Sequence, residues 1–207
     1  YFPATGNLVP FVPQGFKKED FRKGYTNIVK AGSGKYWIST LYNGMIYVDG
    51  SGPAIQYAST QKNTDKKIPD GEIVDFTMTA DNDLWLLMRD KGLVHISIYN
   101  KDVQYREIFA EKEGLTNNSL YDIVHDPERN LWITTNTGMF CFLTRQKAFL
   151  KYTAANGFGN MKFHSNEADM AALANGYIGI YEKIGNISWF KPQSKTRENK
   201  IKLLLSS

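Results

Sequence analysis

Three tryptophans recur at nearly equal intervals in the 207-residue sequence, each within a similar short segment. Trp37 and Trp85 are 48 residues apart, and Trp85 and Trp132 are 47 residues apart. A fixed period of this size is typical of an array in which one supersecondary unit packs against the next. This repeat therefore constrains the fold more strongly than any other property of the sequence.

The repeating unit is clearest between residues 119 and 152, where four short runs of β-forming residues alternate with turn residues. These runs are 119–125, 131–135, 139–143 and 148–152. Strands of about five residues joined by short turns form a β-meander. A glycine follows each tryptophan by six or seven residues, namely Gly44, Gly92 and Gly138. We expect each glycine to adopt a positive φ in the hairpin between the second and third strands.

Four-stranded meanders at this spacing are typical of β-propeller blades, so the sequence predicts an all-β, partial propeller whose tryptophans pack between blades. A β-sandwich of irregular strands is the alternative, but it does not explain the period. The predicted divisions are the end of a preceding blade at 1–12, blades at 13–62, 63–109 and 110–153, and a partial closing blade at 154–207. The closing blade is expected to have three strands, with Tyr177 in the place of the tryptophan.

The charge and the single cysteine exclude several classes of protein. The net charge is +4, but acidic residues accompany each lysine cluster, so we expect no binding to nucleic acid. Cys141 has no partner for an internal disulfide and is expected to be a buried, inert thiol. No apolar stretch approaches the roughly 18 residues that span a bilayer, so no membrane contact by this segment is expected. A chain that begins with Tyr1 is expected to be a piece of a larger protein.

Residues 113–140 carry a resemblance to a known repeat. The segment EGLTNNSLYDIVHD, continued by NLWITT and GMF, resembles the two-component-regulator propeller repeat, which has the outline "GL…N…V..I..D..G.LW.GT..GL". The glycine of the second strand is replaced by Ser39, Leu87 and Thr134 in the three units. Residues 156–192 are similar to the closing blade of such sensors, which ends in an "FxP" element, here Phe190-Lys191-Pro192.

This resemblance implies a class of function. Such propellers form the extracytoplasmic, periplasmic sensor region of hybrid two-component proteins of the inner membrane, many of them in gut Bacteroidetes. Many of these sensors respond to oligosaccharides released from complex glycans. An immunoglobulin-like domain follows the propeller in the family. The expected partners of this chain are therefore an oligosaccharide and the remaining blades and immunoglobulin-like domain of its parent. The sequence contains no kinase motif, so the segment itself is not expected to be an enzyme.

The strand order indicates where a ligand would bind. The turn between the second and third strands of a blade emerges on the same face as the connection to the next blade, and loops on a rigid scaffold often carry binding function. That face is expected to carry Tyr42, Arg89, Asp90 and Asn136, which combine an aromatic ring with hydrogen-bonding groups. Ordinary solvated turns are the alternative for all four residues.

No catalytic residue, cofactor or metal site is predicted. The histidines His95, His125 and His164 are scattered over different units and match no zinc spacing. A propeller-based protein-interaction scaffold and a glycan-active propeller enzyme remain as alternative functions. Unpaired strand edges at the ends of an open row of blades also predict self-association of the segment, edge to edge.

Overall fold

The structure consists of four antiparallel sheets of four strands each, arranged in chain order as the blades of a β-propeller. The computed structural model describes residues 12, 16, 24–41, 44–50, 53–57, 68–80, 82–115, 119–153, 156, 158, 163, 168–182, 187–192 and 204–205. The predicted all-β propeller is therefore confirmed. The hairpin of a preceding blade, expected at 1–12, lies outside the described residues apart from Val12.

The first two sheets contain the following strands. The first sheet consists of β1 (Tyr25–Gly32), β2 (Lys35–Thr40), β3 (Met45–Asp49) and β4 (Ile55–Tyr57). The second sheet consists of β5 (Ile73–Ala80), β6 (Asp83–Met88), β7 (Gly92–Tyr99) and β8 (Asp102–Phe109). A short 3-10 helix, η3 (Glu111–Glu113), begins the connection from β8 to the third sheet.

The last two sheets repeat the same order. The third sheet consists of β9 (Leu120–His125), β10 (Leu131–Thr135), β11 (Gly138–Leu143) and β12 (Ala148–Tyr152). The fourth sheet consists of β13 (Ala168–Ala172), β14 (Ile178–Glu182), β15 (Ile187–Phe190) and β16 (Leu204–Leu205). The fourth sheet thus has one strand more than the three expected, because β16 pairs with β15.

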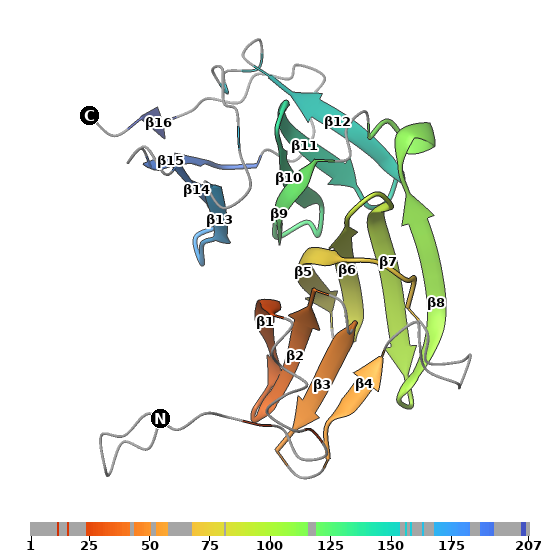
Figure 1. Ribbon diagram of the computed structural model, residues 1–207. Helices are drawn as coiled ribbons and strands as arrows, with labels where there is room; N and C mark the ends of the chain where they lie inside the picture. The colour runs from red at the N-terminus through yellow and green to blue at the C-terminus, as the bar shows by residue number, and fades with distance from the viewer. Residues whose placement is uncertain are drawn as a thin grey trace, which may run out of the picture.

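The first strands of the four sheets, β1, β5, β9 and β13, surround a common centre, and the later strands of each sheet lie progressively outward (Figure 1). The inner strands of consecutive sheets contact one another. The first and fourth sheets stand apart, so the fan of blades is open on one side, at the left of Figure 1. Six of the eight sheet faces are therefore packed against a neighbouring sheet, and the two outermost faces are not.

Each sheet has two sides, because side chains alternate along a strand. We call the side that carries Trp37, Trp85 or Trp132 the Trp side, and the opposite side the receiving side. Trp85 and Leu87 of the second sheet pack against Ile133 and Phe142 on the receiving side of the third. The same relation holds between the first and second sheets and between the third and fourth.

The tryptophans therefore pack between adjacent blades, as predicted. Trp37, Trp85 and Trp132 are all at least 95% buried. The Trp132 ring lies with its centroid 4.7 Å from that of Phe190, the aromatic residue of the predicted closing element. Truncating a buried tryptophan of this kind to alanine typically costs about 3–5 kcal/mol. The period in the sequence thus reflects one packing requirement that recurs in each interface.

The fourth sheet carries its tryptophan on a different strand. The register of β13 and β14 places Gly179, and not Tyr177, at the position equivalent to Trp132, which corrects the expectation from the sequence. Gly179 pairs across the sheet with Trp189 of β15. The tryptophan of this blade has therefore moved from the second strand to the third, where it lies next to a glycine that has no side chain of its own.

Candidate functional site

The turns that join second and third strands lie beside the connections between blades, as the strand order predicts. In the turn from β6 to β7, a Cβ atom on Gly92 would come within 2.5 Å of Phe109 O, at the end of β8. In the turn from β10 to β11, the backbone N–H of Asn136 donates to Ser119 O over 3.4 Å. Both turns thus flank the connection between β8 and β9. The expected positive φ values are present at Gly44, Gly92 and Gly138.

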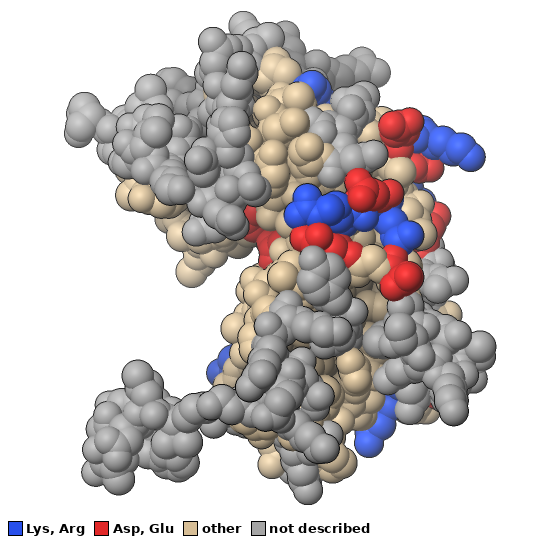
Figure 2. Space-filling view, in the orientation of Figure 1, with Lys and Arg blue, Asp and Glu red and all other residues tan. Residues whose placement is uncertain are grey.

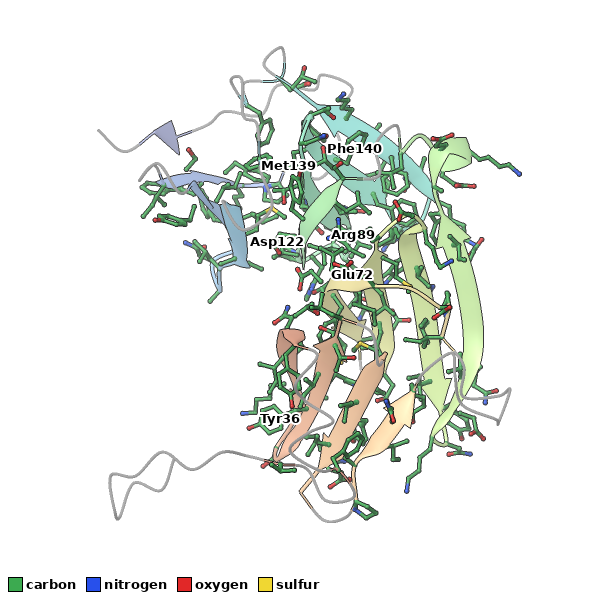
Figure 3. The ribbon with its side chains drawn as sticks, in the orientation of Figure 1. Tyr36, Glu72, Arg89, Asp122, Met139 and Phe140 are labelled. Atoms are coloured by element: carbon green, nitrogen blue, oxygen red, sulfur yellow. The ribbon has the colours of Figure 1, made fainter. Side chains whose placement is uncertain are left out.

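Arg89 belongs to an ion pair that the sequence did not reveal. Its Nε and Nη2 atoms donate to Glu72 Oε2 and Oε1, at 2.7 and 2.8 Å. The hydrogen bond from Arg89 holds the pKa of Glu72 below its usual value. Figure 3 shows the two side chains next to each other near the centre of the fan. About half of the Arg89 side chain is exposed, so the guanidinium remains accessible while Glu72 fixes its direction.

The structure describes two of the other three predicted residues. Asp90 is an exposed turn residue with a φ of 61°, directly after Arg89. Asn136 is exposed in the equivalent turn of the third blade. Tyr42 lies outside the described residues. The structure therefore brings Arg89, Asp90 and Asn136 to one face of the propeller, on either side of the connection between β8 and β9.

Charged side chains of both signs lie on the face of the molecule that Figure 2 shows. Figure 2 shows lysine and arginine side chains intermingled with aspartate and glutamate side chains on the face in view. Arg89 pairs with Glu72, and Lys147, in the turn from β11 to β12, pairs with Glu107 of β8 at 2.6 Å. A surface of both signs does not provide the continuous positive field that binding to a phosphate backbone requires.

A row of polar side chains on the inner strands joins each blade to the next. Asn27, Asp75 and Asp122 are the row, and 48 and 47 residues separate them. Asn27 Nδ2 donates to Asp75 Oδ1 at 2.7 Å, and Ile123 N donates to Asp75 Oδ2 at 3.0 Å. Met170 N donates to Asp122 Oδ2 in the same manner. We call these three residues the axial ladder. The sequence offered a clue to it, because the three positions follow the same period as the tryptophans.

The two carboxyl groups of the axial ladder are buried and interact with each other. Burial raises the pKa of both Asp75 and Asp122, and the hydrogen bond with Asp75 and its negative charge raise that of Asp122 further, to about 9. Two carboxylates this close resist simultaneous ionisation, so the pair retains a proton near neutral pH. With one proton retained, the two carboxyl groups together carry a single negative charge at the joint between blades.

The two histidines that the structure describes are partly buried and have hydrogen-bonding partners. His95 Nε2 lies 2.6 Å from Asp83 Oδ1, and its ring stacks on Trp85 with a centroid distance of 3.9 Å. Burial opposes the ionisation of Asp83, but hydrogen bonds from His95 and Thr79 outweigh it and lower its pKa. His125 Nδ1 is 3.0 Å from Thr77 Oγ1, and burial lowers the pKa of this histidine.

Cys141 is buried, as predicted, and burial raises the pKa of its thiol, which disfavours the reactive thiolate. Within the part of the chain that the structure describes, no three acidic, histidine or cysteine side chains are grouped so that they could hold a metal ion. Among the same residues, no helix is both long and apolar enough to cross a membrane.

Comparisons with known proteins agree with this architecture. The chain is similar in structure to the extracellular domain of a hybrid two-component system of B. thetaiotaomicron, with a TM-score of 0.63 and 13% identity over 88% of this chain and 24% of the other. It also resembles virginiamycin B lyase from Staphylococcus aureus (TM-score 0.56, 16% identity, 82% of this chain and 56% of that one). PorZ of Porphyromonas gingivalis gives a TM-score of 0.57 at 12% identity, covering 89% of this chain and 26% of PorZ.

These likenesses show the propeller fold, and the chain spans about a quarter of the first and third of these proteins and about half of the second. No curated protein matches the sequence significantly. The two component regulator propeller family matches residues 114–137, which run from the β8–β9 connection through β9 and β10 to the following turn. The resemblance inferred from the sequence is thus confirmed: residues 114–137 match the two component regulator propeller family.

Proposed function

We propose that this chain is a ligand-sensing propeller segment of a hybrid two-component regulator, exposed outside the cytoplasm in the periplasm. The observation that carries the proposal is the family match at residues 114–137. The extracellular origin of the similar B. thetaiotaomicron domain supports the same role and location. The segment contributes recognition, and the catalytic output belongs to other parts of the parent protein.

We further propose that the ligand is an oligosaccharide derived from a glycan and that it binds at the face formed by the turns after β6 and β10. This face carries a guanidinium held by Glu72, the carboxylate of Asp90 and the amide of Asn136. Sugar hydroxyls both donate and accept hydrogen bonds, so they suit a mixture of donors and acceptors. The matched repeat includes both the connection and the turn that border this face.

Calorimetric titration with a library of plant and host oligosaccharides tests this proposal. We expect Asp90→Ala and Asn136→Ala each to weaken binding roughly tenfold, the effect of losing about 1.4 kcal/mol of contact free energy. Glu128→Ala is the matched control, because Glu128 is an exposed turn residue between β9 and β10 at the other end of the blade. Binding that Glu128→Ala weakens as much as the other two variants would contradict this location of the site.

The same oligosaccharides should be incubated with the protein and examined by mass spectrometry for cleavage. A sensor segment leaves them intact. Turnover that survives purification to homogeneity would overturn the sensor role in favour of a glycan-active enzyme. Absence of binding to any oligosaccharide, together with binding to a protein partner, would favour an interaction scaffold instead.

A further inference from the structure

The contacts between consecutive sheets differ at one position of the inner strands. We number these contacts the first, second and third joints, in chain order. In each joint, one residue of the inner strand pairs with the tryptophan of the next strand and lies on the Trp side. It is Val29 in the first joint, Thr77 in the second and Val124 in the third. Of the three joints, only the second therefore has a polar residue at this position.

Thr77 forms a hydrogen bond with His125 across the second joint. Its Oγ1 atom is 3.0 Å from Nδ1 of His125, on the receiving side of the third sheet. The positions equivalent to His125 are those of Met78 and Ala172, 47 residues before it and 47 residues after it. Met78 packs against the apolar cluster of the first joint. The first and third joints thus have apolar residues at both positions, whereas the second has a hydroxyl group and a titratable ring.

The turn after β9 brings one negative and one positive group near the partly buried His125. Burial has the largest influence and lowers the pKa of His125, Asp126 raises it and Arg129 lowers it, and the result is below the ordinary value. The carboxylate of Asp126 is already engaged, because Oδ1 accepts from Asn130 N at 2.9 Å and Oδ2 accepts from Trp132 Nε1 at 3.1 Å. Asp126 is therefore held by its own sheet.

The carboxylates of the second sheet that lie on the side facing His125 also have other partners. They are Asp75, Asp83 and Glu107. Their partners are Asn27 and Ile123 for the first, His95 for the second and Lys147 for the third. Among the described residues, the only histidine in an ion pair is His95. A proton on His125 would therefore add a charge to the second joint without an ion-pair partner.

We propose that protonation of His125 in acid loosens the second joint and leaves the first and third joints intact. A charged ring is poorly accommodated in a partly buried interface that offers it no carboxylate. Because the pKa of His125 is lowered by folding, the neutral ring stabilises the folded protein above the unfolded pKa of about 6.5. This contribution is lost progressively as the pH falls below that value.

The second joint lies between the two halves of the face that we propose for ligand binding. The turn with Asp90 belongs to the second sheet, and the turn with Asn136 belongs to the third. Loosening of the joint would let these two turns move apart, so the shape of the face would depend on pH. The inference concerns the joint itself and holds whatever ligand the face binds.

Hydrogen exchange followed by NMR at pH 7.5 and 5.5 tests the inference. The backbone amides of Ile123 and Met170 are matched reporters, because each donates to a carboxylate of the axial ladder, across the second and the third joint respectively. The intrinsic effect of pH on exchange is subtracted. We expect the protection of Ile123 to fall at least about tenfold at the lower pH through local opening, and that of Met170 to stay constant.

A double variant, Thr77→Val with His125→Met, gives the second joint the residue types of the first. The protection of Ile123 in this variant should not depend on pH over the same range. His125→Gln should behave in the same way, because it keeps an acceptor for the hydroxyl of Thr77 and cannot ionise. Thr77→Val alone is the control, since it retains the titratable ring and should remain sensitive to acid.

Two results would overturn the proposal. The first is an equal loss of protection at Ile123 in the wild type and in His125→Gln, because the acid effect would then come from another group. The second is an equal loss at Ile123 and Met170 in the wild type, because the opening would then not be confined to the second joint.

Discussion

Trp132 donates its indole N–H to the carboxylate of Asp126, six residues earlier, over 3.1 Å. The indole of Trp85 donates over the same distance to Thr79 Oγ1, which is also six residues earlier. The equivalent residue of the first blade is Ala31, six residues before Trp37, and it has no polar side chain. The Trp37 indole nitrogen is buried and has no partner in the part of the chain that the structure describes.

Ala31→Thr should therefore stabilise the protein. A threonine hydroxyl at this position would supply the partner that Thr79 gives to Trp85, and a satisfied buried hydrogen bond typically contributes about 1 kcal/mol. Ala31→Val has nearly the same shape without the hydroxyl and serves as the control. Urea unfolding gives the free energy of each variant. Equal stabilities of the threonine and valine variants would show that the indole finds no partner there.

Asp122→Asn should reduce the dependence of stability on pH. The pKa of Asp122 in the folded protein, about 9, is above the unfolded value near 3.9, so the contribution of this group is complete in acid and declines as the pH rises between these values. Asparagine mimics the protonated acid and can still accept from Met170 N. As the pH rises from 5 to 9, the unfolding free energy of the variant should increase relative to that of the wild type. A constant difference would contradict the shared proton.

Asp75→Asn should be the more harmful of the two isosteric changes in the ladder. Both carboxylate oxygens of Asp75 already accept hydrogen bonds, from Asn27 Nδ2 and from Ile123 N. An amide would direct an N–H group at one of these donors and leave it unsatisfied, at a cost of about 1–3 kcal/mol. Thermal unfolding at pH 5 compares the two variants under one condition. Equal melting temperatures would show that the two positions are interchangeable.

Gly92→Ala should destabilise the protein more than Gly34→Ala. Both glycines have a positive φ, +92° and +67°, and an alanine in such a conformation costs about 1–2 kcal/mol. A Cβ on Gly92 would also clash with Phe109 O, whereas a Cβ on Gly34 would contact nothing within 4 Å. The difference in unfolding free energy between the two variants measures how closely the turn approaches β8. A difference near zero would contradict that approach.

The sequence predicted the repeated part of the fold because one interaction recurs in it. Each of the three tryptophans fills an equivalent interface, so their period and the accompanying glycines indicate strands, turns and blades from the sequence alone. The last blade could not be predicted in the same way. Its tryptophan lies on the third strand opposite Gly179, so no tryptophan stands at the position that the period marks.

The candidate site could be predicted only in part. Strand order placed Arg89, Asp90 and Asn136 on one face, because the connectivity of a meander fixes where its turns emerge. The ion pair with Glu72 could not be predicted, because it joins a turn to a segment that precedes the blade and depends on the path of that segment. The axial ladder is intermediate: its spacing is visible in the sequence, but its hydrogen bonds require the inner strands to be adjacent.

The axial ladder also bears on how proteins of this kind change in length during evolution. A ladder residue of one sheet bonds to the inner strand of the following sheet, and Asp75 and Asp122 do so through the same backbone position. A duplication of a repeat that carries an aspartate at this position would therefore restore the same joint on both sides of the new boundary. Gene rearrangements in steps of 47 or 48 codons can thus lengthen or shorten the array without new compensating substitutions at its centre.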